Sequence, residues 1–277
     1  MEKVEYFRNS KSERFRYREN IPENSKAAVL CVHGFAEHFG RYSHIEEKLV
    51  GSGYSFHMMD NRGHGKSVGK RGHIGRYDDY IDDLHLFRKM VQEKNGNKKL
   101  FVLGHSNGSL ISARYALKYG DGISGLVLSG IPIRQGFEVN PLKLKLGLAL
   151  AKVVPGLTVP GEIPPEDICR DKKVVQDYIN DPLVFKVNSV GFAREFFWAM
   201  EDLLSRAAEF KHPVLFLHGG SDKLCSPPAA KEFYEKISSD DKEFILYDGL
   251  YHEVFNEFEK EDIIAGAIQW LNKRAGE

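Results

Sequence analysis

Short apolar runs that alternate with helical patterns constrain the fold of this chain more than any other feature of its sequence. The apolar runs lie at residues 28–32, 54–59, 100–103, 123–129 and 214–217. Their largely continuous apolar character is typical of strands that are buried on both faces. The clearest helical pattern, at 77–94, has apolar residues at three- and four-residue steps. Strands that alternate with helices predict a mostly parallel central sheet flanked by helices, and an extended pattern at 4–19 adds an antiparallel hairpin to its start.

The alternation stops after residue 130 and resumes after residue 211. The interval is punctuated by proline and glycine and holds two helical patterns, at 141–154 and 189–205. We therefore expect one α/β sheet domain, formed by residues 1–130 and 212–277, with a mainly helical cap inserted at 131–211.

Charge and cysteine content exclude several classes of protein. Among the 277 residues, 39 Lys and Arg balance 39 Asp and Glu, so no overall field favours nucleic acid and we expect no nucleic-acid partner. Cys31, Cys169 and Cys225 fit neither a disulfide framework nor a zinc site, which indicates a reducing compartment. The first 20 residues lack the apolar core of a secretory signal, and the most apolar stretch, at 142–154, is too short to span a bilayer. These features predict a cytoplasmic protein.

A serine motif follows the apolar run at 100–103 and precedes a helical pattern at 110–119. It reads Gly104-His105-Ser106-Asn107-Gly108 and matches Gly-x-Ser-x-Gly. A serine on a sharp turn between a strand and a helix presents its hydroxyl above the sheet, and the flanking glycines let neighbouring backbone approach. The alternative is a glycine-rich turn with a surface serine, but the strand before it and the helix after it favour a nucleophile. We therefore predict that Ser106 is the nucleophile.

A serine nucleophile needs a histidine base that a carboxylate orients, and in folds of this kind the acid and then the histidine follow the serine along the chain. Asp222 lies in the loop after 214–217, and His252 lies in the loop after the next strand pattern, at 243–247. Either residue alone would more often be a solvated loop residue. Because both follow consecutive strands in the required order, we predict Asp222 as the acid and His252 as the base.

Acyl transfer also needs hydrogen-bond donors for the negative charge that develops on the substrate oxygen. Such donors are commonly the NH after the nucleophile and an NH in the loop after an earlier strand. These would be the backbone NH groups of Asn107 and of Phe35, which follows the run at 28–32.

Six motifs stand in order along nearly the whole chain. They read His33-Gly34-x-x-Glu37-His38-x-x-Arg41-Tyr42, Asp60-x-Arg62-Gly63-His64-Gly65-x-Ser67, Gly104-His105-Ser106-x-Gly108, Asp181-Pro182-Leu183, His218-Gly219-x-x-Asp222 and Tyr251-His252-Glu253. Together they resemble the monoacylglycerol lipase and lysophospholipase branch of the α/β hydrolases. The resemblance implies an α/β-hydrolase fold with a helical cap, and a serine hydrolase that cleaves fatty-acyl esters of small polar alcohols.

By this resemblance, four side chains would line a polar pocket for the glycerol hydroxyls, while the acyl chain would lie under the cap. The four are Glu37, Arg41, His105 and, from the cap, Tyr178. For Glu37 and Arg41 the alternative is a structural ion pair that fixes the loop carrying Phe35.

The motif around the serine departs from the family in two places. Met often follows the serine and a second glycine usually follows the motif, whereas Asn107 and Ser109 stand here. The departure leaves the three catalytic candidates intact, but it puts the polarity expected of the pocket in question.

The apolar pattern at 141–154 is too rich in leucine and valine for an ordinary solvent-facing helix. It could dock on a lipid surface, with its lysines toward the headgroups, and admit a fatty chain. Alternatively, it could pack on the sheet domain, and the two interpretations are compatible. The first predicts peripheral contact with membranes.

We therefore predict an enzyme that hydrolyses a small lipid, with monoacylglycerol as the preferred substrate. The spacings of the glycine and histidine residues do not match nucleotide-binding or metal-binding motifs, so we expect no cofactor and no metal. Lysophospholipase and acyl thioesterase are alternatives, since they need the same three side chains and differ in what the pocket holds. A non-catalytic lipid- or signal-binding protein of the same fold is the alternative from another class. The sequence leaves the oligomeric state undetermined.

Overall fold

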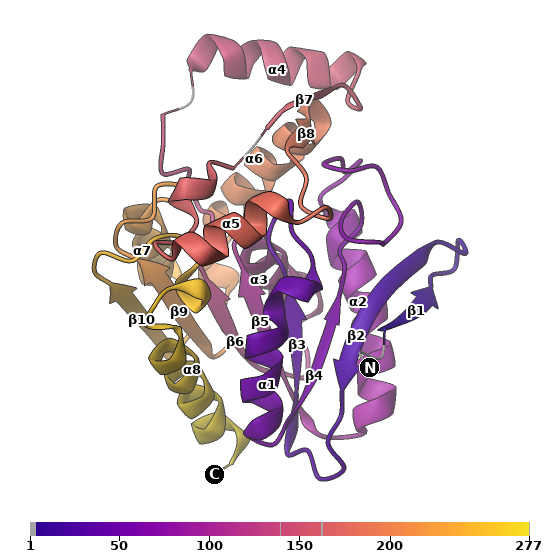
Figure 1. Cartoon of the computed structure of the whole chain (residues 1–277), viewed down its shortest axis with the longest axis vertical. Helices are drawn as coiled ribbons and strands as arrows, with labels where there is room; N and C mark the ends of the chain where they lie inside the picture. The colour runs from indigo at the N-terminus through magenta and orange to yellow at the C-terminus, as the bar shows by residue number, and fades with distance from the viewer. Residues whose placement is uncertain (1–3, 139, 162, 277) are drawn as a thin grey trace.

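An eight-stranded sheet forms the centre of the computed structural model, which describes residues 4–276 apart from 139 and 162 (Figure 1). Its strands are β1 Val4–Arg8, β2 Arg14–Asn20, β3 Ala27–Val32, β4 Tyr54–Met59, β5 Lys99–His105, β6 Ile123–Ser129, β9 Val214–Gly219 and β10 Lys242–Tyr247. Their order across the sheet is β1-β2-β4-β3-β5-β6-β9-β10. The strands from β4 to β10 in this order run parallel, whereas β1 and β2 form an antiparallel hairpin at one edge. The predicted mostly parallel sheet and its opening hairpin are confirmed.

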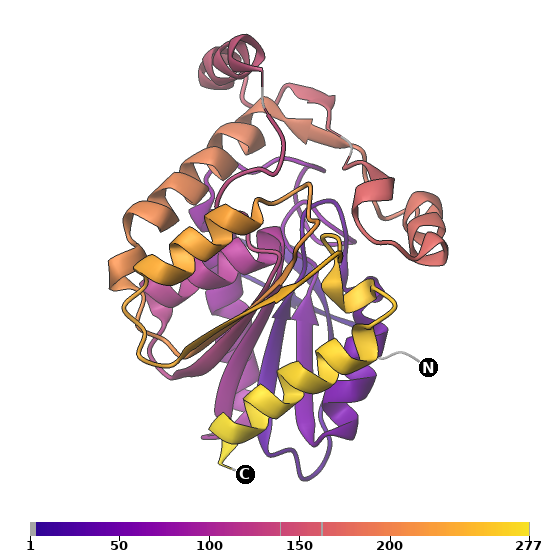
Figure 2. The same cartoon turned by 90° about the vertical axis from the view of Figure 1, so that its left-hand side faces the viewer.

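Helices cover both faces of this sheet (Figure 2). They are α1 Ser43–Gly51, α2 Asp78–Asn95, α3 Asn107–Tyr119, α7 Pro227–Lys236 and α8 Lys260–Ala275. Helices α1 and α8 bury their apolar side chains against one face, and α2, α3 and α7 bury theirs against the other. Helix α1 lies outside the sequence prediction, because only Ile45, Glu46 and Leu49 of its nine residues are buried and its apolar period is correspondingly weak.

The described residues between β6 and β9, in the interval 131–211 that the sequence predicts to be a cap, lie above the sheet, and we call this part of the chain the cap (Figure 1). Its elements are α4 Pro141–Val153, β7 Thr158–Pro160, α5 Lys172–Asn180, β8 Val187–Ser189 and α6 Val190–Ser205. This part of the chain also contains the short 3₁₀ helices η2 Pro165–Asp167 and η3 Ala207–Glu209, whereas η1 Phe39–Tyr42 and η4 Val254–Asn256 lie in the sheet domain. The antiparallel pair of β7 and β8 escapes sequence prediction, because strands of three residues are too short to establish a period.

The two longest helices of the cap, α6 and α4, pack in different places. Helix α6 reaches the core of the sheet domain through Ala199, Met200 and Leu203, which are buried. Helix α4 packs on α6 rather than on the sheet, and it leaves Leu142 76% exposed and Val153 81% exposed. No helix within the described part of the chain is both long and apolar enough to cross a bilayer.

Candidate active site

Ser106 occupies the sharp turn between β5 and α3. Its φ of 52° and ψ of −124° are values that residues other than glycine rarely adopt. The turn depends on Gly108, where an added Cβ would stand 2.0 Å from the carbonyl oxygen of Val32 in β3. The hydroxyl of Ser109 lies 2.7 Å from the carbonyl oxygen of Gly104, across the same turn. Ser109 therefore helps to hold the turn that presents Ser106.

Asp222 and His252 lie in the loops that follow β9 and β10, two adjacent parallel strands. His252 Nδ1 is 2.7 Å from Asp222 Oδ2, and both side chains are buried. The backbone amides of Leu224 and Cys225 donate to Asp222 Oδ1 at 2.8 and 2.9 Å, which fixes the carboxylate. His218 of β9, which stands in the same motif as Asp222 but was given no role, places Nε2 3.2 Å from Asp222 Oδ2. The carboxylate thus faces two imidazoles.

The buried Asp222 and His252 side chains shift each other's pKa. Burial is the largest single effect and would raise the pKa of Asp222, but the charges and hydrogen bonds of His252 and His218 together outweigh burial and hold that pKa below its usual range. Burial alone would likewise lower the pKa of His252, but Asp222 raises it well above its ordinary value. The pair is therefore suited to stabilise the imidazolium that forms when His252 accepts a proton.

Ser106 and His252 line the same two cavities. Within the described residues no hydrogen bond joins the two side chains directly, and Cys225 lines the larger of these cavities together with both. Hydrogen bonds between catalytic groups often align fully only once substrate is bound. Burial raises the pKa of the Cys225 thiol, so it is protonated at neutral pH and a poor nucleophile.

Asp222, Cys225 and His252 also place potential metal-ligand atoms within 4.8 Å of one another. A metal would need the thiol deprotonated, and it would have to compete with the hydrogen bond between the other two side chains. The donor set as it stands suits proton transfer better than metal binding.

The larger of the two cavities, which we call the apolar cavity, has a volume of about 330 Å³ and extends from Ser106 toward the cap. Its apolar walls include Phe35, Pro132, Phe137, Phe192, Phe196 and Phe197. The rings of Phe35 and Phe192 stack with their centroids 4.2 Å apart, so the cap contacts the loop after β3 here. Three residues with amide side chains, Asn107, Gln135 and Asn188, also border this cavity, although Asn107 is only 1% exposed.

The smaller cavity, which we call the polar pocket, has a volume of about 10 Å³ and brings together the four residues predicted to bind the alcohol. Arg41 Nη1 donates to Glu37 Oε2 at 2.7 Å, and Arg41 Nη2 donates to Glu253 Oε2 at 2.7 Å. The Arg41 guanidinium also lies 4.9 Å from the centroid of the Tyr178 ring. Glu253 belongs to the motif Tyr251-His252-Glu253, but its place in this pocket was not predicted. The remaining predicted residue, His105, lines the pocket next to Ser106.

The polar pocket carries a net negative charge. Burial is the largest single effect and would raise the pKa of Glu37, but Arg41 and, to a smaller extent, the neighbouring histidines and the Tyr42 hydroxyl together lower it to about 2. Burial lowers the pKa of His105 to about 4, so its imidazole is neutral at pH 7. Two carboxylates, those of Glu37 and Glu253, therefore face the single guanidinium of Arg41. The ion pair expected as a structural alternative is present, and its members line the pocket as well.

Phe35, the predicted oxyanion donor, lies on the loop between β3 and η1. This loop approaches the nucleophile so closely that a Cβ at Gly34 would stand 3.1 Å from the Cβ of Ser106. No hydrogen bond given for the described residues uses the Phe35 amide, and a residue in the first turn of α3, such as Asn107, has no acceptor within the helix for its NH. Neither NH group therefore has a protein acceptor among the described residues, as the predicted role requires.

The chain is similar to a known protein family, to individual members of other species and to a solved structure. The model of a family described as serine aminopeptidase, S33, matches residues 23–259. The chain is 31% identical to a monoacylglycerol lipase of Mycolicibacterium smegmatis, covering 89% of this chain and 88% of that protein. It is 33% identical to an uncharacterised abhydrolase domain-containing protein of Dictyostelium discoideum over 90% of this chain, but it spans only 26% of that protein's length. The crystal structure of a Paleococcus ferrophilus monoacylglycerol lipase is similar at a TM-score of 0.86, with 30% identity over 94% of this chain and 99% of that one.

The pairing of Asp222 with His252 predicts a defined pH dependence. His252 can accept the serine proton only when neutral, and Asp222 raises its pKa. Activity is therefore lost as pH falls through a value above about 6.5, the ordinary histidine pKa. The substitution Asp222→Asn should lower kcat by about 10³- to 10⁴-fold and move this acid limb to lower pH. The measurement is kcat/KM against pH for a soluble ester. Asp248→Asn, an exposed acid in the same loop as His252, is the control, and an equal loss in both variants would contradict the prediction.

Proposed function

This chain belongs to the serine aminopeptidase S33 family of α/β hydrolases, and from that premise we propose that it hydrolyses monoacylglycerol to fatty acid and glycerol. Family membership agrees with the predicted fold and with an ester hydrolase. The observation that carries the proposal is the position of Ser106 between an apolar cavity and a small polar pocket. A monoacylglycerol has the same division, with an acyl chain on one side of the ester and a polyol on the other.

In the proposed mechanism, Ser106 Oγ attacks the ester carbonyl while His252 takes its proton. Asp222 keeps the imidazole oriented and stabilises its charged form. The backbone NH groups of Phe35 and Asn107 hold the negative oxygen of the tetrahedral intermediate. His252 then returns the proton to the departing glycerol, and a water molecule activated by the same base releases the fatty acid from Ser106.

The polar pocket favours glycerol over the headgroups of the alternative substrates. A volume of about 10 Å³ holds about one hydroxyl-sized group. The carboxylates of Glu37 and Glu253, which outnumber the guanidinium of Arg41, repel a phosphate. Hydroxyl groups can donate to these carboxylates and accept from Arg41. We therefore rank monoacylglycerol above lysophospholipid and above an acyl thioester with a large leaving group.

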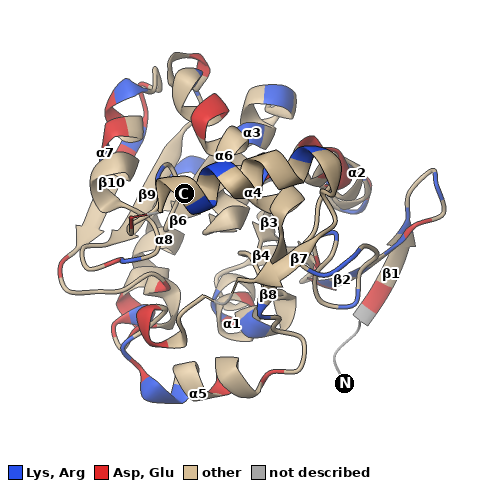
Figure 3. Cartoon of the chain, turned by 90° about the horizontal axis from the view of Figure 1, so that it is seen from above, with Lys and Arg blue, Asp and Glu red and all other residues tan. Residues whose placement is uncertain are grey.

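Helix α4 supports a further proposal, that the cap contacts membranes from one side. Leu142, Leu146 and Val153 are more than half exposed, and the charged residues of the helix are all lysines (Figure 3). An apolar surface with cationic residues suits binding to an anionic lipid surface. We therefore place the protein at the periphery of membranes, from which its substrate would enter the apolar cavity under the cap.

The function is tested by hydrolysis of a matched pair of substrates, monolauroylglycerol and methyl laurate. Wild type should release lauric acid from both, and Ser106→Ala should release none above background. Arg41→Ala should lower kcat/KM on the monoacylglycerol by about tenfold more than on the methyl ester, because only glycerol uses the polar pocket. An active Ser106→Ala variant would reject the nucleophile. An equal loss on both substrates would make Arg41 purely structural.

Membrane contact is tested by sedimentation with vesicles of phosphatidylcholine and phosphatidylglycerol. The double substitution Leu142→Glu and Leu146→Glu should reduce vesicle binding by about tenfold or more, because it places charges on the apolar surface of α4. Leu86→Glu, which alters an exposed leucine of α2 in the sheet domain, is the matched control. Binding that survives the double substitution, or that Leu86→Glu reduces equally, would exclude α4 as the contact.

A further inference from the structure

The backbone NH of Asn107, a predicted oxyanion donor, takes its direction from the strained turn at Ser106. This NH belongs to the peptide unit that joins the two residues, and the ψ of Ser106, −124°, sets its orientation. A strained backbone conformation persists only where surrounding contacts hold it. The carbonyl oxygen of Ser129 in β6 accepts hydrogen bonds from the Ser106 NH and from the Ser109 hydroxyl, both at 2.8 Å. These bonds hold residues before and after Asn107, and the Asn107 side chain supplies a further anchor at the donor itself.

This further anchor is a hydrogen bond from the hydroxyl of Tyr77. The hydroxyl donates to Asn107 Oδ1 at 2.6 Å, and the two residues are 0% and 1% exposed. The Tyr77 ring packs edge-on against the ring of Tyr80, with their centroids 5.5 Å apart. Removing one partner of a buried hydrogen bond leaves the other partner unsatisfied. Without the Tyr77 hydroxyl, the Asn107 side chain and the NH beside it would therefore be held less firmly.

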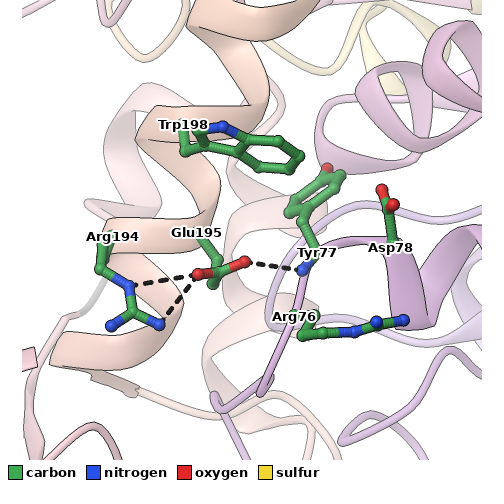
Figure 4. Close-up of a pocket in the computed structure, with 6 residues that line it drawn as sticks. All are labelled: Arg76, Tyr77, Asp78, Arg194, Glu195 and Trp198. Carbon is green, nitrogen blue, oxygen red and sulfur yellow. Dashed lines mark hydrogen bonds and ion pairs between the residues drawn. The ribbon is translucent and has the colours of Figure 1, made fainter. Parts of the chain in front are cut away.

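The cap holds Tyr77 in turn, through Glu195 of α6. The Tyr77 NH donates to Glu195 Oε2 at 3.0 Å, and Arg194 donates to Oε1 of the same carboxylate at 2.9 and 3.1 Å (Figure 4). Tyr77 stands just before the first turn of α2, where the helix offers its NH no acceptor. A Glu or Gln at the third helical position often accepts from such an NH, but Tyr80 occupies that position here. Glu195 therefore supplies the missing acceptor from another part of the chain.

We propose that Tyr77 and Glu195 are positioning residues for the oxyanion donor, so that the Asn107 NH is aimed fully only when the cap is in place. Glu195 fixes Tyr77, and Tyr77 fixes Asn107. Neither Tyr77 nor Glu195 is among the described residues that line the apolar cavity or the polar pocket, so neither acts by touching the substrate. This inference rests on the proposed ester hydrolysis at Ser106. It adds that the cap contributes to the rate of the reaction as well as to the choice of substrate.

The test measures hydrolysis of p-nitrophenyl butyrate and inhibition by decyl trifluoromethyl ketone. The Ser106 Oγ adds reversibly to the ketone carbon and its proton passes to His252, so the ketone oxygen carries the negative charge that the oxyanion donors bind. Tyr77→Phe should lower kcat by about tenfold, less than the roughly 10²- to 10³-fold cost of losing a whole donor. It should leave KM within about twofold of wild type, because the contact improves in the transition state and not in the bound ester. The Ki of the ketone should rise by about the factor by which kcat/KM falls.

Tyr80→Phe is the matched control for Tyr77→Phe. Tyr80 is also buried in α2, and its hydroxyl has no hydrogen-bond partner within the described residues. The control therefore removes a hydroxyl from the neighbouring buried ring without touching Asn107. It should leave both kcat and the Ki of the ketone unchanged.

The part played by the cap is tested at Glu195. Glu195→Leu removes the acceptor of the Tyr77 NH and should lower kcat and raise Ki by about threefold, whereas Glu195→Gln keeps an acceptor oxygen and should recover most of this loss. In the double variant with Tyr77→Phe, the loss should be smaller than the product of the two single losses, because the two residues act in series. Glu201→Leu, which alters an exposed acid of the same helix, is the control and should change neither quantity.

The inhibitor separates positioning from stability. Partial unfolding would lower the amount of active enzyme, and with it kcat, but it would leave the Ki of the folded fraction unchanged. An unchanged Ki in Tyr77→Phe, or an equal rise in Tyr80→Phe, would therefore overturn the inference. So would a change confined to KM, which would assign Tyr77 to substrate binding, or an effect of Tyr77→Phe with none of Glu195→Leu, which would leave the cap without a part.

Failure of the proposed function would look different. If wild type hydrolysed neither p-nitrophenyl butyrate nor monolauroylglycerol, the proposed function would fail and this inference with it. An active wild type whose Ki is not moved by Tyr77→Phe would reject the inference alone.

Discussion

The hydrogen bond between Asp222 and His252 is the contact on which the chemistry of this site depends. It joins side chains 30 residues apart in the sequence at 2.7 Å. The sheet makes this possible because β9 and β10 are adjacent and parallel, so the loops that follow them leave the same edge. Without the carboxylate, burial would lower the pKa of the imidazole and leave its charged form unsupported. With it, His252 can take and return a proton beside Ser106.

The cap belongs to the site as much as the sheet domain does. Phe192 of the cap packs on Phe35, in the loop after β3, and Tyr178 of the cap packs on Arg41 in the polar pocket. The sheet domain supplies Ser106, Asp222 and the base, while the cap closes both the apolar cavity and the polar pocket around them. The specificity that we propose therefore comes from contacts between the two parts, whereas the reactive groups come from the sheet domain.

The sequence predicted the features that depend on residues close together in the chain. Continuous apolar runs predicted the parallel strands, and the position of Ser106 between a strand and a helix predicted the strained turn found there. The order of Asp222 and His252 along the chain predicted that they would lie close together. Glu253 and His218 stand in two of the quoted motifs, but their contacts with Arg41 and Asp222 could not be predicted, because a single sequence does not show which polar residues become buried side by side. The hydrogen bond from the Tyr77 hydroxyl to Asn107 Oδ1 joins residues 30 positions apart, and only coordinates reveal it.

Labelling with a fluorophosphonate, followed by peptide mass spectrometry, tests most directly whether this arrangement activates a serine. The reagent phosphonylates an activated hydroxyl and mimics the tetrahedral intermediate. We predict one stoichiometric adduct, on the peptide that contains Ser106, with no modification of Cys225 although its thiol lies beside the same histidine. An unlabelled protein, or an adduct on any residue other than Ser106, would contradict the assignment of the nucleophile and the mechanism built on it.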